Sequence, residues 1–282
     1  MKYTSTRNTA VSVDAATAVI DGISADGGLF VPETLPKLDY HALLGLDYAA
    51  RVDAVLRGFF DFDVSGVAKA AYASFDGDPA PVIKLDDRLY MLELWHGATC
   101  AFKDMALSVL PRLLPRAKAA KGNADKTLVL VATSGDTGKA ALEGFKDVDG
   151  TSVCVFYPTD GVSRVQKLAM QTQAGANVLA VGITGNFDDA QTAVKRAFAD
   201  ASLKARLAEN GVALSSANSI NIGRFVPQIA YYFSAYCDLV NAGEIENGDK
   251  IDFVVPTGNF GNILAGWYAR RMGLPVNKLV CA

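Results

Sequence analysis

From residue 127 onward the chain repeats a strand, a loop and a helix, and this repeat constrains the fold more than any other feature. Two of the expected strands, 127–132 and 251–255, are continuously apolar at their centres. Such strands are typical of a sheet that is covered on both faces, because both rows of side chains are then buried. The sequence therefore predicts an α/β fold with mostly parallel strands and helices on both faces. The expected strands are 127–132, 152–157, 178–183, 212–215, 251–255 and 278–281.

The N-terminal part of the chain has a different pattern. Between residues 11 and 74, apolar residues recur at helical spacing, most clearly over 52–59 and 64–71. This spacing predicts a small and mostly helical N-terminal region. Ser65 is placed near the start of the second run, where its hydroxyl could cap a helix. We therefore expect Ser65 to be an N-cap.

Glycine and proline then mark a boundary. The sequence Asp-Gly-Asp-Pro at 76–79 fits a turn better than a helix or a strand. It divides the chain into an expected N-terminal domain, residues 1–78, and an expected catalytic region, residues 79–282. The first feature after the boundary is a short predicted hairpin, with strands at 82–85 and 88–92.

Two further segments depart from regular patterns. Apolar residues have helical spacing over 103–118, but Pro111 and Pro115 each remove a backbone donor and crowd the preceding turn. We expect a kink or an early end in that helix. The sequence stops at 278–282, inside an expected buried strand, where domains seldom end. We therefore expect the chain to be part of a longer protein.

Composition narrows the possible partners. The chain has 27 Lys and Arg against 30 Asp and Glu, a net charge of −3 and no run of like charges, which argues against a nucleic-acid partner. Its four cysteines lie far apart and it has only two histidines, so we expect neither a zinc site nor disulfides. Cysteines that stay reduced indicate a cytoplasmic protein. No targeting segment is evident, and no apolar stretch approaches the ~20 residues that span a bilayer, so we expect no membrane partner.

The loop at 133–138, with the sequence TSGDTG, follows an apolar strand and precedes a helix. Ligands of open α/β sheets bind beyond the carboxyl ends of the strands. Small residues let a backbone approach a ligand, and hydroxyls and free N–H groups at a helix start can hold a carboxylate or a phosphate. The loop is not a Walker A loop, because that pattern would need glycine in place of Thr133 and Ser or Thr in place of Ala140. The alternative is an ordinary glycine turn in which Asp136 or Thr137 caps the helix.

A second loop, 256–262 with the sequence PTGNFGN, has the same position after the strand at 251–255. Its glycines have GxxG spacing, so the GxGxxG dinucleotide fingerprint is absent. This spacing disfavours a function as a nucleotide-binding oxidoreductase. A phosphate could be surrounded by backbone N–H groups here, at the positive end of the helix dipole. The alternative is a turn that needs glycine only for positive φ.

The segment 93–104, ELWHGATCAFKD, places a lysine behind two apolar residues. Partial desolvation of Lys103 would lower its pKa and free the amine to attack a carbonyl. The alternative is a structural or surface lysine, and for His96 a structural role is favoured. Three more loops carry polar groups: 218–221 together with Arg224, 182–191, and 163–166. For the last two we expect helix caps and first-turn acids.

Taken in order, four of these motifs closely resemble threonine synthase of the longer type with an N-terminal domain. The motifs are HGATCAFKD, TSGDTG, ANSINIGR and PTGNFGN, and the segments DGGLFVP at 26–32 and GNFDDAQ at 185–191 support them. The resemblance implies the fold of pyridoxal-phosphate enzymes related to the tryptophan synthase β subunit, fold type II. It also implies the conversion of O-phospho-L-homoserine and water to L-threonine and phosphate.

The resemblance assigns roles to individual residues. Lys103 would form the Schiff base with pyridoxal 5'-phosphate and then move protons among the substrate's carbons. Asp136 occupies the position at which relatives outside the family often have an asparagine beside the cofactor's ring oxygen. The cofactor phosphate would be held by Gly258, Asn259, Phe260, Gly261 and Asn262, the substrate carboxylate by Thr133, Ser134 and Thr137, and the substrate phosphate by Asn218, Ser219 and Arg224. No metal is required.

Two departures from the family pattern leave alternatives open. Ala98 stands where the family usually has proline, which implies a modest change in loop stiffness. The family's chain continues past Ala282, and that additional part would complete the large-domain sheet and supply the partner of the cofactor's ring nitrogen. The alternatives are therefore another pyridoxal-phosphate phospholyase, an amino-acid dehydratase, or an inactive fragment that binds anions or a partner. The oligomeric state is not indicated.

Overall fold

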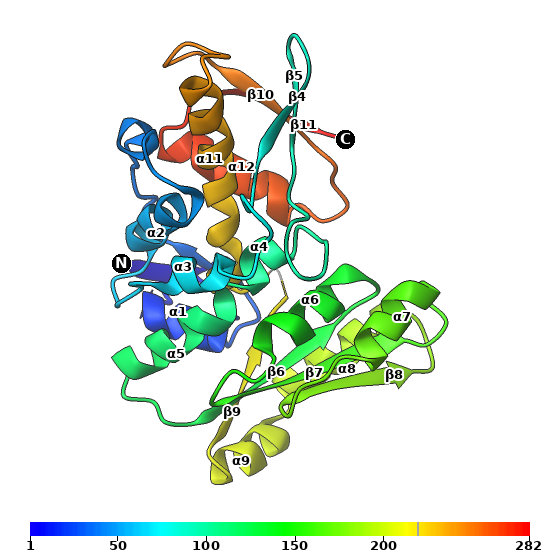
Figure 1. Cartoon of the computed structure of the whole chain (residues 1–282). Helices are drawn as coiled ribbons and strands as arrows, with labels where there is room; N and C mark the ends of the chain where they lie inside the picture. Colours follow the sequence, from blue (N-terminus) through cyan, green and yellow to red (C-terminus); the bar gives the residue numbers. More distant parts are fainter. Residues whose placement is uncertain (219) are drawn as a thin grey trace.

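The structure is a computed structural model of the chain that describes residues 1–218 and 220–282 (Figure 1). A parallel sheet with its helices lies at one end, and a body built around helix α11 (Pro227–Asn241) lies at the other. Helix α11 is buried along almost its whole length. It packs against helices from both the N-terminal and the C-terminal parts of the chain, so it is the central element of that body.

The parallel sheet has four strands in the order β8-β7-β6-β9. Every neighbouring pair is parallel, and Val129 is registered with Val153 on one side and with Ser215 on the other. The first four strands predicted after residue 126 are thus confirmed, with bounds within one residue of those expected. They are β6 (Lys126–Ala132), β7 (Thr151–Pro158), β8 (Val178–Ile183) and β9 (Val212–Ser216).

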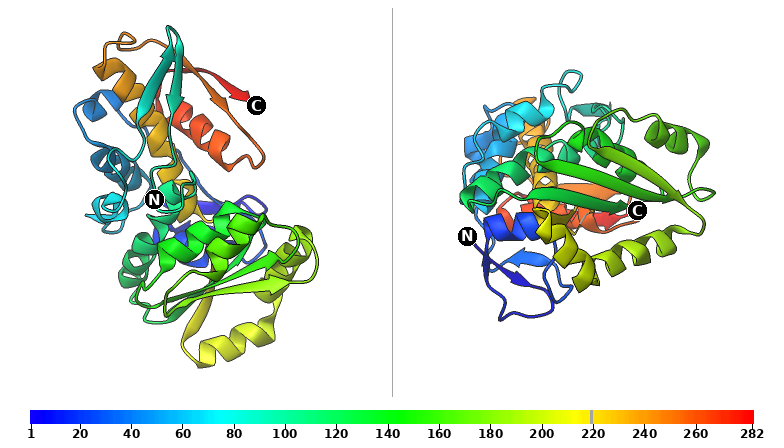
Figure 2. Two further views of the ribbon diagram at one scale, coloured as in Figure 1. Left: turned by 45° about the vertical axis from the view of Figure 1, so that its right-hand side comes forward. Right: turned by 90° about the horizontal axis from the view of Figure 1, so that it is seen from below.

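Helices cover both faces of this sheet (Figures 1 and 2). Val129 of β6 belongs to the core that includes α6 (Asp136–Phe145), whereas the next residue, Leu130, packs with Ala190 of α8 (Phe187–Ala199). Consecutive residues of β6 are therefore buried on opposite faces, which explains why the strand is continuously apolar. The remaining helices of these layers are α7 (Arg164–Gln171) and α9 (Ala201–Glu209).

The two loops in which we expected helix caps contain them. Ser163 forms a capping box with Gln166 at the start of α7, and Asn186 forms one with Asp189 at the start of α8. In both boxes each side chain bonds a backbone N–H that the first helical turn would leave without a partner.

The N-terminal region contains the expected helices and also a small sheet that the sequence pattern did not predict. The sheet is antiparallel, with the strand order β2-β1-β3. Its strands have four, two and three residues in chain order, too few to display a period of two. The elements are β1 (Lys2–Ser5), β2 (Val13–Asp14), α1 (Ala15–Asp21), β3 (Phe30–Pro32), the 3₁₀ helix η1 (Tyr40–Leu43), α2 (Tyr48–Phe59) and α3 (Val67–Tyr72).

The predicted cap at Ser65 is wrong. Helix α3 begins at Val67, and its N-cap is Gly66, which has a left-handed φ of 74° and makes no side-chain cap. Glycine adopts this conformation without steric cost. The hydroxyl of Ser65 instead accepts a hydrogen bond of 3.3 Å from Arg57 Nη2.

The hairpin and the interrupted helix are both confirmed. Strands β4 (Val82–Asp86) and β5 (Leu89–Leu92) pair antiparallel. The segment after Lys103 divides into α4 (Asp104–Leu107) and α5 (Leu110–Ala120), so the helix breaks just before Pro111. The break lets α4 and α5 follow different directions, and α4 carries Lys103 at its N-cap.

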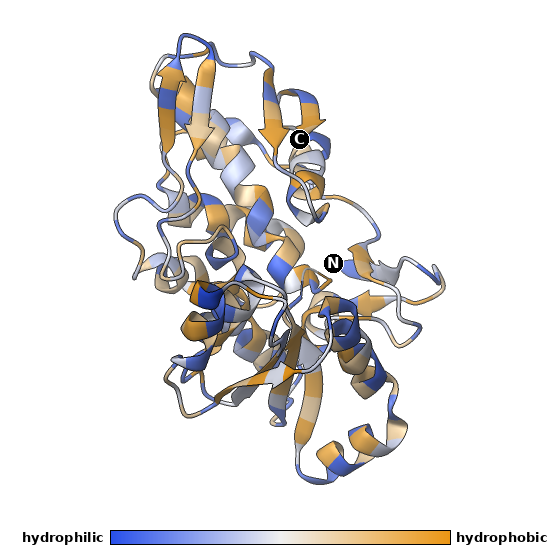
Figure 3. Ribbon diagram, turned by 90° about the vertical axis from the view of Figure 1, so that its right-hand side faces the viewer, coloured by the Kyte–Doolittle hydropathy of each residue, from blue (hydrophilic) through white to orange (hydrophobic). Residues whose placement is uncertain are grey.

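The last two strands do not join the four-stranded sheet. Strands β10 (Ile251–Val255) and β11 (Val276–Cys281) form a separate parallel pair, joined by α12 (Gly261–Met272). We expected β10 to be buried on both faces, but Val254 is 64% exposed, so that expectation is wrong for the described chain. In Figure 3 the strands beside the C-terminus include hydrophobic stretches, as do strands of the larger sheet.

The described part of the chain contains no helix with both the length and the apolar composition needed to cross a bilayer. The remaining helix, α10 (Ile222–Phe225), lies between β9 and α11 and carries Arg224.

Candidate active site

Lys103 lies at the N-cap of α4, at the end of the loop that begins at Gly97. Its side chain is half-buried, and its Nζ lies 3.8 Å from the ring centroid of Phe102. Burial lowers the pKa of the Lys103 amine, and the charge of Arg224 lowers it further, whereas Asp136 acts in the opposite direction. Charges from two distant parts of the sequence, Arg224 and Asp136, therefore act on this amine.

The loop before Lys103 is held by Asp104. One carboxylate oxygen accepts from the backbone N of Thr99 at 2.8 Å, and the other accepts from its hydroxyl at 2.6 Å. A Cβ at Gly97 would lie 2.5 Å from Cβ of Asp104, so only glycine allows this approach. Cys100 is held in the same turn with a positive φ of 54°. These contacts fix the backbone just ahead of the lysine.

Arg224 is the most buried cation of the site, with 3% of its surface exposed. Its Nη1 donates to the carbonyl of Ala217 at 2.6 Å and its Nη2 to Oγ1 of Thr137 at 3.4 Å. Its Nε has no hydrogen-bond partner within residues 1–218 and 220–282. Burial lowers the pKa of Arg224 to about 10, with no described carboxylate opposing the shift. A buried guanidinium with an unused donor is suited to bind an anion.

The TSGDTG loop is organised by Thr133. Its hydroxyl accepts from the backbone N of Gly135 at 3.1 Å and of Gly138 at 3.0 Å, and donates to the carbonyl of Gly135 at 2.9 Å. Thr133 is buried, whereas Ser134 is exposed and Thr137 is half-buried. The loop therefore presents Ser134 and Thr137, while the Thr133 hydroxyl is engaged inside it.

The alternative in which Asp136 or Thr137 caps the following helix is wrong. The N-cap of α6 is Gly135, which makes no side-chain cap, and Asp136 is the first residue of the helix. Asp136 instead accepts from Nε2 of Gln166 at 2.9 Å. Gln166 thus orients the carboxylate whose charge acts on Lys103. The sequence pattern identified Gln166 only as part of a helix start.

In the PTGNFGN loop, neither Gly258 nor Gly261 has a positive φ. The alternative in which these glycines serve only a left-handed turn is therefore wrong. A Cβ at Gly258 would meet no heavy atom within 4 Å, so the space beside this glycine is open. The loop leads directly into α12, whose first-turn N–H groups lack helical partners. Asn259 and Phe260 lie at the tip of this loop, and Phe260 is exposed.

Asn262 is held by two buried tyrosines of α11. Its Oδ1 accepts from the hydroxyl of Tyr231 at 2.6 Å and from that of Tyr232 at 2.8 Å. Helix α11 also packs against α4, which begins beside Lys103. The central helix therefore supports both the lysine segment and the start of α12.

Asn218 lies at the end of β9, where its Nδ2 donates to the carbonyl of Ala132 at 3.3 Å. This bond places it beside the start of the TSGDTG loop. Ser219, the other residue assigned with it, lies outside the described residues. His96 bonds Glu93 at 2.8 Å, as expected for a structural histidine.

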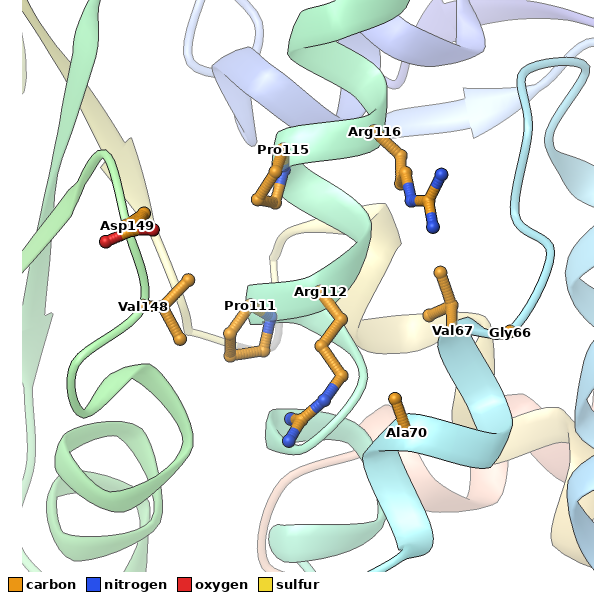
Figure 4. Close-up of a pocket in the computed structure, with 9 residues that line it drawn as sticks. All are labelled: Gly66, Val67, Ala70, Pro111, Arg112, Pro115, Arg116, Val148 and Asp149. Atoms are coloured by element: carbon orange, nitrogen blue, oxygen red, sulfur yellow. The ribbon is translucent and has the colours of Figure 1, made fainter.

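Two cavities lie away from these residues. One of about 330 Å³ lies between α3, α5 and the turn after α6 (Figure 4). Arg112 and Arg116 project from α5 on the side of Val67, whereas Pro111 and Pro115 face Val148. A neighbouring cavity of about 210 Å³ is lined by Lys118 and Thr151. Neither cavity includes Lys103 or Arg224.

Comparisons with known proteins show the family of the chain. Residues 2–72 match the family model "Threonine synthase N terminus", and residues 77–282 match "Pyridoxal-phosphate dependent enzyme". The chain is 40% identical to threonine synthase of Pseudomonas aeruginosa over 100% of its length, and 42% identical to human threonine synthase-like 1 over 94%. A crystal structure of threonine synthase from Brucella melitensis with bound pyridoxal phosphate superposes with a TM-score of 0.88 at 38% identity, over 100% of this chain.

These relatives are longer than this chain. It covers 60% of the Pseudomonas protein, 38% of the human protein and 60% of the Brucella structure. Yeast threonine synthase gives a similar result, with a TM-score of 0.87, 34% identity and 58% of its chain covered. The likeness therefore extends over this whole chain and over part of each relative.

Proposed function

The chain belongs to the family of pyridoxal-phosphate-dependent enzymes, in the group with the threonine synthase N-terminal segment, and from this premise we propose that it acts as a threonine synthase. The proposed reaction converts O-phospho-L-homoserine and water to L-threonine and inorganic phosphate. The observation that carries the proposal is a partly desolvated amine, Lys103, under the influence of a buried guanidinium, Arg224. The Nε of Arg224 has no hydrogen-bond partner among the described residues.

The residues of the site fit pyridoxal phosphate. Burial favours the uncharged form of the Lys103 amine, which is the form that binds an aldehyde. The open space at Gly258 and the N–H groups at the start of α12 would hold the cofactor phosphate. Asp136, whose charge acts on Lys103, would lie near the cofactor ring. When bound, the cofactor supplies the electron sink that carbanion chemistry needs.

Arg224 would bind the phosphate group of the substrate. A planar guanidinium can make two parallel hydrogen bonds to a phosphate. Among the described residues Nε has no partner, and Nη2 has the 3.4 Å bond to Thr137. Burial removes competing water, so the charge of Arg224 stabilises the departing phosphate more strongly than a surface arginine could. Asn218 and Ser219 would complete this part of the site.

Ser134 and Thr137 would bind the substrate carboxylate together with N–H groups at the start of α6. The Thr133 hydroxyl keeps the loop in shape through its bonds to Gly135 and Gly138. Lys103, once free of the cofactor, would move protons between neighbouring carbons of the substrate. Its lowered pKa favours the uncharged amine, which is the form that can accept a proton.

Arg224 also distinguishes the proposed activity from that of a dehydratase. A buried guanidinium without a carboxylate partner among the described residues costs free energy unless an anion binds it. A phosphorylated substrate supplies an anion in addition to its α-carboxylate, whereas serine or threonine has only the carboxylate, which Ser134 and Thr137 would bind. The observation thus favours a phosphorylated substrate.

The experiment that tests the proposal is a product analysis. The chain is incubated with pyridoxal phosphate and O-phospho-L-homoserine, and threonine and inorganic phosphate are measured. We expect equal amounts of both products, none with Lys103→Ala, and a KM at least about tenfold higher with Arg224→Gln, because a charged hydrogen bond is lost. Arg116→Gln, a change at an exposed arginine, is the matched control and should change neither value. Phosphate without threonine, or faster turnover of serine, would contradict the proposal.

A further inference from the structure

We propose that the N-terminal segment positions Arg224, and that Asn221 is the residue through which it does so. This inference rests on the proposed role of Arg224 in binding phosphate. It gives helix α1, which has no residue in the site described above, a part in setting the geometry of the anion site.

Asn221 joins three elements through one buried side chain, which is 1% exposed. Its Nδ2 donates to the carbonyl of Val19 in α1 at 3.1 Å and to the carbonyl of Ser216 at the end of β9 at 3.0 Å. Its Oδ1 accepts from the backbone N of Gly223 in α10 at 2.8 Å. Every hydrogen-bonding position of the amide except one acceptor lone pair is thereby used.

The position of Arg224 follows from this arrangement. Its backbone N donates to the carbonyl of Asn221 at 3.0 Å, and its Nη1 donates to the carbonyl of Ala217 at 2.6 Å. Both ends of the arginine are therefore attached to residues that precede α10, namely Ala217 and Asn221. Asn221 also bonds Ser216 and Val19, so a shift of α1 would move the guanidinium.

The contact between α1 and α10 leaves no room for adjustment. Gly22 is the C-cap of α1, with a φ of 69°, and a Cβ there would lie 2.8 Å from Nδ2 of Asn221. On the other side, a Cβ at Gly223 would lie 3.2 Å from Cγ1 of Val19 and 2.9 Å from Cδ1 of Leu110. Glycine at both positions permits the close approach, and any added atom must displace Asn221 or α10.

Ser215 provides a matched comparison. It is also buried, and its hydroxyl donates to the carbonyl of Ile20 at 2.8 Å, so it joins the same helix to the same strand. It makes no contact with α10 among the hydrogen bonds of the described residues. Loss of Ser215 should therefore weaken the attachment of α1 without moving Arg224.

The test measures the affinity of the pyridoxal-phosphate-loaded chain for inorganic phosphate by titration calorimetry, with thermal unfolding of each variant measured alongside. We expect Asn221→Ala to bind phosphate about tenfold more weakly, the equivalent of one hydrogen bond to a charged group. Ser215→Ala should lower the unfolding temperature comparably and change the phosphate affinity less than about twofold.

Gly22→Ala tests the same inference by a change in the N-terminal segment, and it replaces Asn221→Ala as the test variant if Asn221→Ala does not fold. Its matched control is Gly66→Ala, since Gly66 has a φ of 74° and a Cβ there would meet nothing within 4 Å. Both variants carry the same backbone strain, and we expect Gly22→Ala alone to weaken phosphate binding.

Arg224→Gln distinguishes a failure of the positioning role of Asn221 from a failure of the proposed phosphate site. If it weakens phosphate binding while Asn221→Ala and Gly22→Ala bind phosphate as the parent chain does, the positioning role is overturned and the proposed function stands. Equal losses in Asn221→Ala and Ser215→Ala would also overturn the positioning role. If Arg224→Gln binds phosphate normally, the proposed phosphate site itself is wrong.

Discussion

Arg224 donates from Nη2 to Oγ1 of Thr137 across 3.4 Å, so the loop after β9 and the loop after β6 meet at a buried guanidinium. The same guanidinium contributes to the lowered pKa of Lys103. One cation therefore links the proposed phosphate site, the proposed carboxylate site and the cofactor lysine.

The pH dependence of Lys103 is the first prediction. Burial, followed by the charge of Arg224, lowers its pKa, so a larger fraction of the amine is uncharged at neutral pH than for an ordinary lysine with a pKa of about 10.4. Acetylation of the cofactor-free chain, read by mass spectrometry across pH, should give a Lys103 midpoint below that value. Arg224→Gln should raise the midpoint only in part, because burial remains. A midpoint at or above the ordinary value would contradict the structure.

The same shift predicts a stability change with pH. The unfolded chain binds a proton at Lys103 that the folded chain has released, in the interval between the lowered pKa and the ordinary one. The contribution of Lys103 to the free energy of unfolding should therefore rise with pH across that interval. Urea unfolding of the parent chain and of Lys103→Met should show this rise in the parent alone.

Packing between α6 and α4 is the subject of another prediction. A Cβ at Gly144 would lie 2.1 Å from the carbonyl oxygen of Leu107, so Gly144→Ala forces the two helices apart. We expect the free energy of unfolding to fall by about 3 kcal/mol in urea titrations. The control is Gly58→Ala in α2, where the new Cβ would lie at an ordinary 3.6 Å from Pro36. That helical glycine should gain about 0.5–1 kcal/mol. Effects of the same sign in both variants would refute the packing argument.

The buried arginine of α2 gives a further prediction. Arg51 is 3% exposed, and its Nη1 bonds Asp238 at 2.5 Å and Ser234 at 2.8 Å, both on α11. Arg51→Leu would leave Asp238 without its cation, so we expect a loss of about 3 kcal/mol. The control, Arg57→Leu, breaks an exposed pair with Asp53 and should cost less than about 0.5 kcal/mol. Urea unfolding measures both changes in the free energy of unfolding. Equal losses would show that the buried Arg51–Asp238 pair contributes no more than the exposed Arg57–Asp53 pair.

The sequence predicted the parts of the fold that depend on local patterns. The repeat of strand, loop and helix identified β6 to β9, and a glycine loop marked the end of β6. Pro111 identified the break after α4. The N-terminal sheet escaped prediction because β2 and β3 have only two and three residues. The boundary at residue 78 stays a prediction. Residues before and after it belong to one hydrophobic core, and Arg51 on one side bonds Asp238 of α11 on the other.

The site was less accessible from the sequence where its contacts are distant in the chain. Asn221 bonds a carbonyl 202 residues earlier, and no spacing rule relates the two positions. Likewise, nothing local shows that the Thr133 hydroxyl is used within its own loop, or that Tyr231 and Tyr232 hold Asn262. Lys103 could be singled out because apolar residues precede it, but the lowering of its pKa depends on burial by the surrounding fold and on the charge of Arg224.

The most direct test of the account is the visible absorbance of the chain with pyridoxal phosphate, recorded before and after addition of O-phospho-L-homoserine. We predict an absorbance band of lysine-bound cofactor that is lost in Lys103→Ala and that changes when the substrate is added to the parent chain. Arg224→Gln should keep the band and need at least about tenfold more substrate for the same change. An identical band in Lys103→Ala, or no response of the parent chain to the substrate, would contradict the account.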